Sequence, residues 1–186
     1  MRLLEQDVSP VGKSRMINSH YKLLIVTFDD IDILPEIKQR VGDYLQCDIV
    51  VKNNHHPKVR RSAKQYFGLC SDANDFLSLL VPLKNSYDFV LGIVKRDLYV
   101  SRLKFVLGLA DPLESVSIIS LARLKSSNKK RYIDRAVKEA VHELGHLLGR
   151  EHCHNPKCVM RFSKRLSDTD KKEDKFCEKC LYSLQK

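Results

Sequence analysis

The chain has 186 residues, of which 43% are hydrophobic, and it carries a formal net charge of +10 at pH 7. A chain of this length can bury enough apolar surface for one domain, but it is too short for two independent domains. The sequence contains no internal repeat, no low-complexity tract and no apolar run of about 18 residues, which argues against a solenoid and against a membrane-spanning helix.

The first half of the chain alternates strand-like and helix-like segments. Short apolar runs, typical of buried strands, are separated by stretches in which apolar residues recur every three or four positions. The predicted strands are 21–29, 47–51 and 87–94, and the predicted helices are 35–45 and 72–83. Such alternation is typical of an α/β sheet.

Two further strands are predicted at 104–110 and 115–124. Only the short turn 111–114 separates them, so we expect them to pair antiparallel, with one of them at the edge of the sheet. Gly108 lies within the first of these runs and would permit close approach of another backbone. The predicted fold class is therefore α/β, one compact domain with a mixed, twisted sheet and an antiparallel edge strand.

A helix is predicted from about Tyr132 to Leu148. Its apolar residues fall at spacings of three and four, which gives the helix a core-facing stripe. The stripe consists of Val137, Ala140, Val141, Leu144 and Leu148. His142 and His146 lie beside the stripe, and because they are four positions apart they can direct their ring nitrogens at one metal ion.

Residues 142–152 read HELGHLLGREH and match the pattern HExxHxxGxxH. Glu143 is close enough to the metal position to hold an attacking water, where a general base is needed. Gly149 can adopt a left-handed conformation, end the helix and bring His152 in as the third ligand. Three ligands leave the fourth zinc position open, which indicates a catalytic site. A bare HExxH occurs by chance in many helices, but the extended pattern is far rarer.

Four cysteines follow the third histidine directly. Thiolates select tetrahedral zinc, and a closed four-sulfur shell leaves no room for water, so this second zinc should be structural. The alternatives are two disulfides or four buried thiols. Because no apolar signal segment opens the chain, we expect a reducing compartment, the cytoplasm, in which reduced thiols bind metal. The four residues are Cys153, Cys158, Cys177 and Cys180.

The stretch from His142 to Cys180 resembles the archaemetzincin family, whose pattern joins the long metzincin zinc motif to a four-cysteine zinc site. Segments 98–99, 105–110 and 120–124 are also similar to that family, so the resemblance covers residues 21–181. It implies a metzincin-like fold with a small, zinc-clamped C-terminal lobe. It also implies that the edge strand Phe105–Ala110 binds the substrate backbone by strand addition.

The resemblance further implies a role for each motif residue and two zinc ions per chain. The catalytic zinc would be held by His142, His146 and His152, and the structural zinc by Cys153, Cys158, Cys177 and Cys180. Glu143 would be the proton acceptor. Met160 matches the methionine that lies beneath the metal in metzincins.

The chain is expected to divide into an N-terminal extension (1–20), a subdomain with the sheet and the active-site helix (21–149) and a C-terminal subdomain with the structural zinc (150–186). The positive charge is uneven, because residues 123–186 contain 17 Lys and Arg against 9 Asp and Glu. Such a face could attract nucleic acid or acidic peptides, but a solvated lysine-rich surface is the favoured interpretation, since no nucleic-acid motif accompanies it.

Together these features predict a zinc metallopeptidase that acts on peptide or protein substrates by a zinc-activated water, with Glu143 as general base. Aminopeptidase action stays open, because no position identifies itself as the acidic group that would hold a free amine. The alternatives are hydrolysis of a non-peptide amide or ester, and a zinc-stabilised module that binds nucleic acid or protein without turnover. Glu143 argues against a binding module, which needs no carboxylate beside its zinc.

Overall fold

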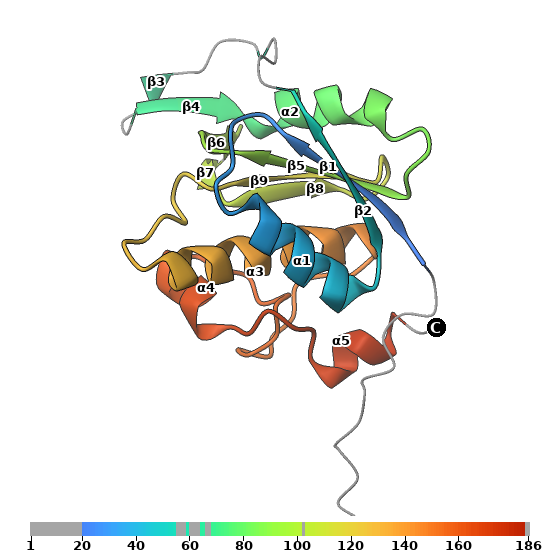
Figure 1. The fold of residues 1–186 in the computed structure, drawn as a ribbon. Coiled ribbons are helices and arrows are strands. Elements are labelled where there is room, and N and C mark those ends of the chain that lie inside the picture. Colours follow the sequence, from blue (N-terminus) through green and yellow to red (C-terminus); the bar gives the residue numbers. More distant parts are fainter. Residues whose placement is uncertain (1–19, 55–58, 60–63, 66–67, 102, 185–186) are drawn as a thin grey trace, which may run out of the picture.

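The computed structural model describes residues 20–54, 59, 64–65, 68–101 and 103–184, so the predicted N-terminal extension lies outside the described residues except for His20. Figure 1 shows a central sheet with helices on both faces. The strands are β1 (Lys22–Thr27), β2 (Asp48–Asn53), β3 (Lys64–Gln65), β4 (Gly68–Asp72), β5 (Phe89–Val94), β6 (Asp97–Val100), β7 (Leu103–Val106), β8 (Gly108–Asp111) and β9 (Val116–Ser120). The helices are α1 (Leu34–Leu45), α2 (Ala73–Leu80), the 3₁₀ turn η1 (Val81–Leu83), α3 (Lys129–Leu147), α4 (Leu166–Lys171) and α5 (Glu178–Tyr182).

The main sheet has the strand order β2-β1-β5-β9-β8. Its first four strands are parallel, whereas β8 pairs antiparallel with β9 and occupies the edge. The predicted α/β class and the antiparallel edge strand are thus confirmed. A second set of strands has the order β3-β4-β6-β7. Of these, only β7 overlaps a predicted strand, because β3, β4 and β6 are short and carry little apolar periodicity.

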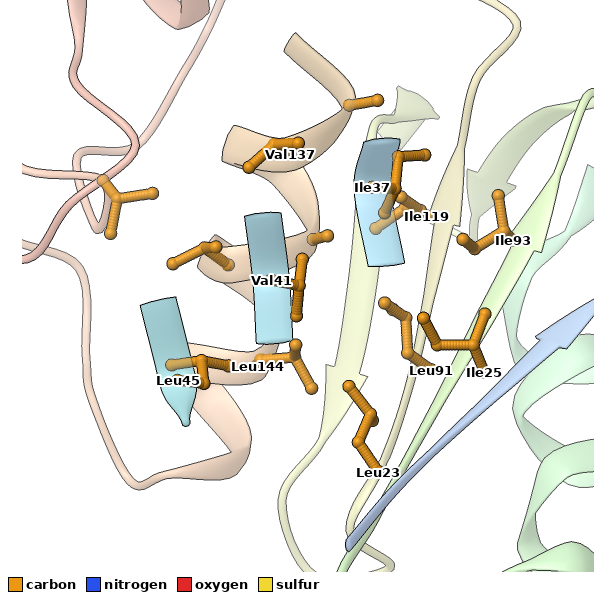
Figure 2. Close-up of a cluster of buried hydrophobic side chains, with 14 of the residues drawn as sticks. Leu23, Ile25, Ile37, Val41, Leu45, Leu91, Ile93, Ile119, Val137 and Leu144 are labelled. Carbon is orange, nitrogen blue, oxygen red and sulfur yellow. The ribbon is translucent and has the colours of Figure 1, made fainter. Parts of the chain in front are cut away.

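The apolar run of β1 is buried on both faces, as expected for a parallel strand covered by helices. Leu23 and Ile25 face α1 and α3, while Leu24 and Val26 face α2. Figure 2 shows the first of these layers, in which side chains of the strands meet side chains of α1 and α3. The labelled strand residues are Leu23, Ile25, Leu91, Ile93 and Ile119, and the labelled helix residues are Ile37, Val41, Leu45, Val137 and Leu144.

The segment predicted as one strand at 104–110 is divided in the structure, and that prediction is wrong in this respect. Residues up to Val106 form β7, which pairs with β6, and residues from Gly108 form β8, which pairs with β9. The chain changes partner at Leu107, whose carbonyl still accepts a hydrogen bond of 2.8 Å from the Ser120 N–H. An uninterrupted apolar run gives no sign of such a change, because the run itself does not specify which neighbouring strand each half pairs with.

The described residues after α3 form short helices and turns that pack against α1 and α3. Arg135 of α3 holds Asp170 of α4 through two hydrogen bonds of 2.6 and 2.7 Å. The Phe176 N–H donates to the Tyr44 hydroxyl of α1 at 2.6 Å. None of the helices in the described part of the chain is both long and apolar enough to cross a membrane.

Candidate active site

Helix α3 begins and ends where its sequence provides the matching caps. At the start, the Asn128 side chain accepts a hydrogen bond of 3.0 Å from the Arg131 N–H. At the end, Gly149 has a φ of +77° and its N–H donates to the His146 carbonyl at 2.9 Å. The predicted left-handed turn at Gly149 is therefore confirmed. It reverses the chain and brings His152 back toward the helix.

The structure brings together the three histidines of the motif. Their ring centroids lie 4.8 to 5.3 Å apart, and the ring atoms that could bind a metal all lie within 4.8 Å of one another. The two Nε2 atoms of His142 and His146 are 3.3 Å apart. A tetrahedral zinc ion with Zn–N bonds of about 2.0–2.1 Å holds its nitrogens about 3.3 Å from each other. The triad therefore fits a zinc ion.

Hydrogen bonds fix which ring nitrogens are available. His142 Nδ1 lies 2.8 Å from the Val159 carbonyl, and His146 Nδ1 lies 2.7 Å from the Arg150 carbonyl. Because a carbonyl can only accept, each Nδ1 is the donor and each Nε2 keeps its lone pair for a metal. Burial lowers the pKa of all three imidazoles, most of all that of His142. Neutral rings with converging lone pairs are suited to binding a cation.

Glu143 is buried against the edge strand. A Cβ atom built on Gly108 would collide with the Glu143 carboxylate and would lie only 2.7 Å from its Cγ and Cδ atoms. The sequence predicted that another backbone could approach Gly108, whereas the structure places the Glu143 side chain there. Burial, reinforced by Glu139, raises the pKa of Glu143 well above its usual value. A carboxylate in such surroundings is a stronger base than one in water.

An ion pair that the sequence did not reveal lies beside the triad. Lys172 Nζ is 3.2 Å from Glu139 Oε1, and the two side chains are only 0% and 4% exposed. The Thr169 hydroxyl donates to the same carboxylate oxygen at 3.2 Å, and Lys172 Nζ donates to the Arg161 carbonyl at 3.4 Å. Glu139 precedes Glu143 by four positions, so helical spacing could have placed it on this face. Lys172 gave no sequence signal.

A cleft of about 550 Å³ contains the triad, Glu143 and the ion pair. The segment 105–110 lines the cleft, and its last three residues belong to the edge strand β8. Phe162 also lines the cleft, and its ring centroid lies 4.9 Å from that of His152. The site is thus reached through a largely apolar groove that follows an edge strand.

Met160 lies under the active-site helix. It is fully buried, and its sulfur lies so close to Gly145 that a Cβ there would collide with it. Gly145 immediately precedes His146. A larger residue at position 145 would push the helix away from this support.

The four cysteines also come together. The Sγ atoms of Cys153 and Cys177, and those of Cys158 and Cys180, are each 3.8 Å apart, and all four lie within 4.8 Å of one another. A tetrahedral zinc with Zn–S bonds of about 2.3 Å gives sulfur separations of about 3.8 Å. No disulfide is present among these residues. The cluster therefore fits a four-sulfur zinc site.

Comparison with known proteins agrees with this geometry. Residues 20–186 match the sequence model of peptidase family M54. An archaemetzincin from Pyrococcus abyssi is 46% identical to this chain over 122 residues. The match covers 61% of this chain and 65% of that protein, so the chain spans slightly less than two thirds of this relative's length. The crystal structure of the Methanopyrus kandleri archaemetzincin is 36% identical with a TM-score of 0.80, and the match covers 90% of this chain and 94% of that one.

A zinc-dependent peptidase from Methanocorpusculum labreanum is 26% identical with a TM-score of 0.76, and the match covers 88% of this chain and 100% of that one. The family match covers all of the described residues, including both metal-binding clusters. The chain belongs to peptidase family M54, the archaemetzincins, a family of zinc metallopeptidases.

Proposed function

We propose that the protein hydrolyses peptide bonds in the cleft between β8 and α3, with a zinc ion held by His142, His146 and His152. The observation that carries this proposal is the convergence of three neutral imidazoles beside a buried carboxylate. A bound zinc ion would supply Lewis acidity, which polarises the scissile carbonyl and lowers the pKa of the attacking water to about 7.

Glu143 is the proposed general base. One of its carboxylate oxygens takes the proton of the attacking water and later delivers it to the leaving amine. Its raised pKa helps in both steps, because the carboxyl can hold the proton long enough to pass it on. Gly108 leaves room for this side chain against the edge strand, so the base is held in one place.

The substrate is proposed to lie along β8. An edge strand in the cleft offers backbone groups to an extended peptide, which would bind by strand addition. Among the described residues that line the cleft, the carboxylates are Glu139 and Glu143. Glu139 is paired with Lys172, so neither is free to hold an amino terminus. This favours internal cleavage over the aminopeptidase action that the sequence left open.

Peptides of one sequence with a free or an acetylated amino terminus distinguish these two modes. Internal cleavage predicts similar kcat/KM for both forms, because the amine takes no part in binding. A strict requirement for the free amine would instead establish aminopeptidase action.

The four cysteines are proposed to hold a second, structural zinc, which makes two ions per chain. The sulfur separations support this assignment, and free thiols at such a site support a reducing location such as the cytoplasm. Metal analysis tests the division. His146→Ala should leave about one zinc per chain at the sulfur site, and two retained ions would contradict the assignment.

Glu143→Gln tests the mechanism. This change keeps the shape of the side chain but removes its basicity, so peptide cleavage should fall by at least about 100-fold while the zinc content stays unchanged. Full activity with both metals bound would show that the assigned base is wrong. Salt-dependent binding of RNA or DNA without any peptide turnover in the unsubstituted protein would favour a binding module instead.

A further inference from the structure

The three histidines of the motif are not held in the same way. Backbone carbonyls accept hydrogen bonds from Nδ1 of His142 at 2.8 Å and from Nδ1 of His146 at 2.7 Å. The His152 ring makes no hydrogen bond to any residue that the structure describes, and it is the most exposed of the three. Because outer contacts set the direction of a ligating ring, His152 requires a support of another kind.

The ring of Phe162 provides such a support. Its centroid lies 4.9 Å from that of the His152 ring, and the two planes are inclined at 59°. At this separation, inclined aromatic rings attract each other. The other rings beside His152 are those of His142, at 5.3 Å, and His146, at 4.9 Å, which belong to the same ligand set. Within the described part of the chain, Phe162 is therefore the one aromatic ring outside the triad that contacts His152.

Hydrogen bonds between the two neighbouring segments hold this ring pair together. The Cys153 N–H donates to the Met160 carbonyl at 2.9 Å, and the Arg161 guanidinium donates to the His154 carbonyl at 3.0 Å. In each bond, one partner lies within two positions of the third histidine and the other within two positions of the phenylalanine. The contact between the rings is thus fixed by the backbone on either side of it, and it does not depend on side-chain packing alone.

Phe162 is not a residue of the hydrophobic core. Its side chain is 49% exposed and lines the cleft of the peptidase site. A half-exposed phenylalanine contributes less to folding than a buried one, since less of its apolar surface is removed from water. Its replacement should therefore leave the fold intact, so that an effect on metal binding can be separated from a loss of stability.

We propose that Phe162 is a positioning residue, which keeps the His152 ring in the direction in which it binds the catalytic zinc. This inference rests on the proposed function, in which the three histidines hold that ion. The phenyl ring contacts His152 and restricts its rotation before the metal binds. A ligand that is already oriented loses less freedom on binding, so the site gains affinity for zinc without an additional metal ligand.

The zinc affinity of the histidine site tests this role in the full chain, with the four-sulfur site filled. Competition with a chromophoric chelator gives the dissociation constant without any measurement of peptide cleavage. Phe162→Ala should raise this constant about three- to tenfold, which is the loss expected for one aromatic contact. Phe162→Tyr keeps the ring, so its dissociation constant should stay within about twofold of that of the unsubstituted protein.

The matched control is Leu103→Ala. Leu103 is 52% exposed and lines the same cleft, but it belongs to β7, which provides none of the three histidines, so its loss should leave the zinc affinity unchanged. Equal weakening of zinc binding in Phe162→Ala and Leu103→Ala would overturn the proposal, and so would a loss in Phe162→Tyr as large as that in Phe162→Ala.

The same titrations separate this inference from the proposed function. If the unsubstituted protein bound zinc at the four-sulfur site alone, the proposed catalytic site would fail and this inference with it. If the protein bound two ions and Phe162→Ala left the dissociation constant of the histidine site unchanged, the inference alone would be overturned.

Discussion

The Lys172–Glu139 pair should show strong non-additivity when its two members are replaced. Lys172→Met leaves the Glu139 carboxylate buried, with the Thr169 hydroxyl as its remaining side-chain partner among the described residues. Removing one member of a buried pair costs about 3–5 kcal/mol, because the remaining charge stays uncompensated. For a domain of this size, that corresponds to a decrease in Tm of roughly 6–20 °C. Glu139→Met should be similarly costly, since it leaves the ammonium of Lys172 buried.

The double variant Lys172→Met/Glu139→Met should recover most of the lost stability. Apolar replacement of both members removes both charges, and such replacements are often neutral or stabilising. The Thr169 hydroxyl and the Arg161 carbonyl then lose a partner, which limits the recovery. We therefore expect the double variant to lie within about 2 kcal/mol of the unsubstituted protein, with a coupling energy of at least about 3 kcal/mol.

Urea denaturation of all four proteins at equal zinc content measures this coupling. The reasoning is refuted if the double variant loses as much unfolding free energy as the two single variants together, or if each single variant loses less than about 1 kcal/mol. In either case the stability of the ammonium and that of the carboxylate would not depend on each other. The KM for peptide cleavage provides a second test of the pair. Lys172 also binds the carbonyl of Arg161, next to Phe162 in the cleft wall, so the stable double variant should show a raised KM.

Two further changes test the placement of the base and an ion pair of α4. Gly108→Ala should lower kcat by about 10- to 100-fold, because the new Cβ displaces the Glu143 carboxylate. The control is Gly42→Ala, whose Cβ would lie at an ordinary distance of 3.5 Å from Ile49, so this variant should keep its kcat unchanged. Equal activity of the two variants would contradict the contact. The pKa of Asp170 is lowered because the Arg135 guanidinium of α3 binds its carboxylate. The ion pair therefore stabilises the fold fully at pH values above the unfolded pKa of about 3.9. This contribution is lost as the pH falls through the lower pKa of the folded protein. Asp170→Asn should lower the free energy of unfolding by about 1–2 kcal/mol at pH 7, allowing for the partial exposure of the pair, and by progressively less below about pH 4. Urea denaturation measures this difference, and a value that stays constant from pH 7 to pH 3 would contradict this account.

The parts of the fold that the sequence predicted are those encoded by local periodicity. The continuous apolar run of β1 indicated a strand buried on both faces, and its alternate residues do enter two separate core layers. The motif predicted the histidine cluster because its spacing is a property of one helix and one glycine turn. Gly149 illustrates this, since its positive φ follows from a helix that has to end within three residues of His146.

The features that the sequence did not predict depend on which elements come together in the folded chain. The change of partner at Leu107 requires both β6 and β9 to be in place. The contact between Gly108 and Glu143 joins an edge strand to a helix, and Lys172, the residue that follows α4, reaches Glu139 of α3. No local pattern encodes such contacts, because each is fixed only when the sheet and the C-terminal segment have packed together.

The histidine site is therefore not a property of α3 alone. The helix brings His142 and His146 together, but the backbone carbonyls that hold their rings belong to the segment after the helix, at Val159 and Arg150. Val159 follows Cys158 directly, so the cluster of four sulfurs holds the carbonyl that orients His142. Such outer contacts set the tautomer and the direction of a ligating ring. A cysteine cluster that looks purely structural thus forms part of the frame that gives the proposed catalytic zinc its geometry.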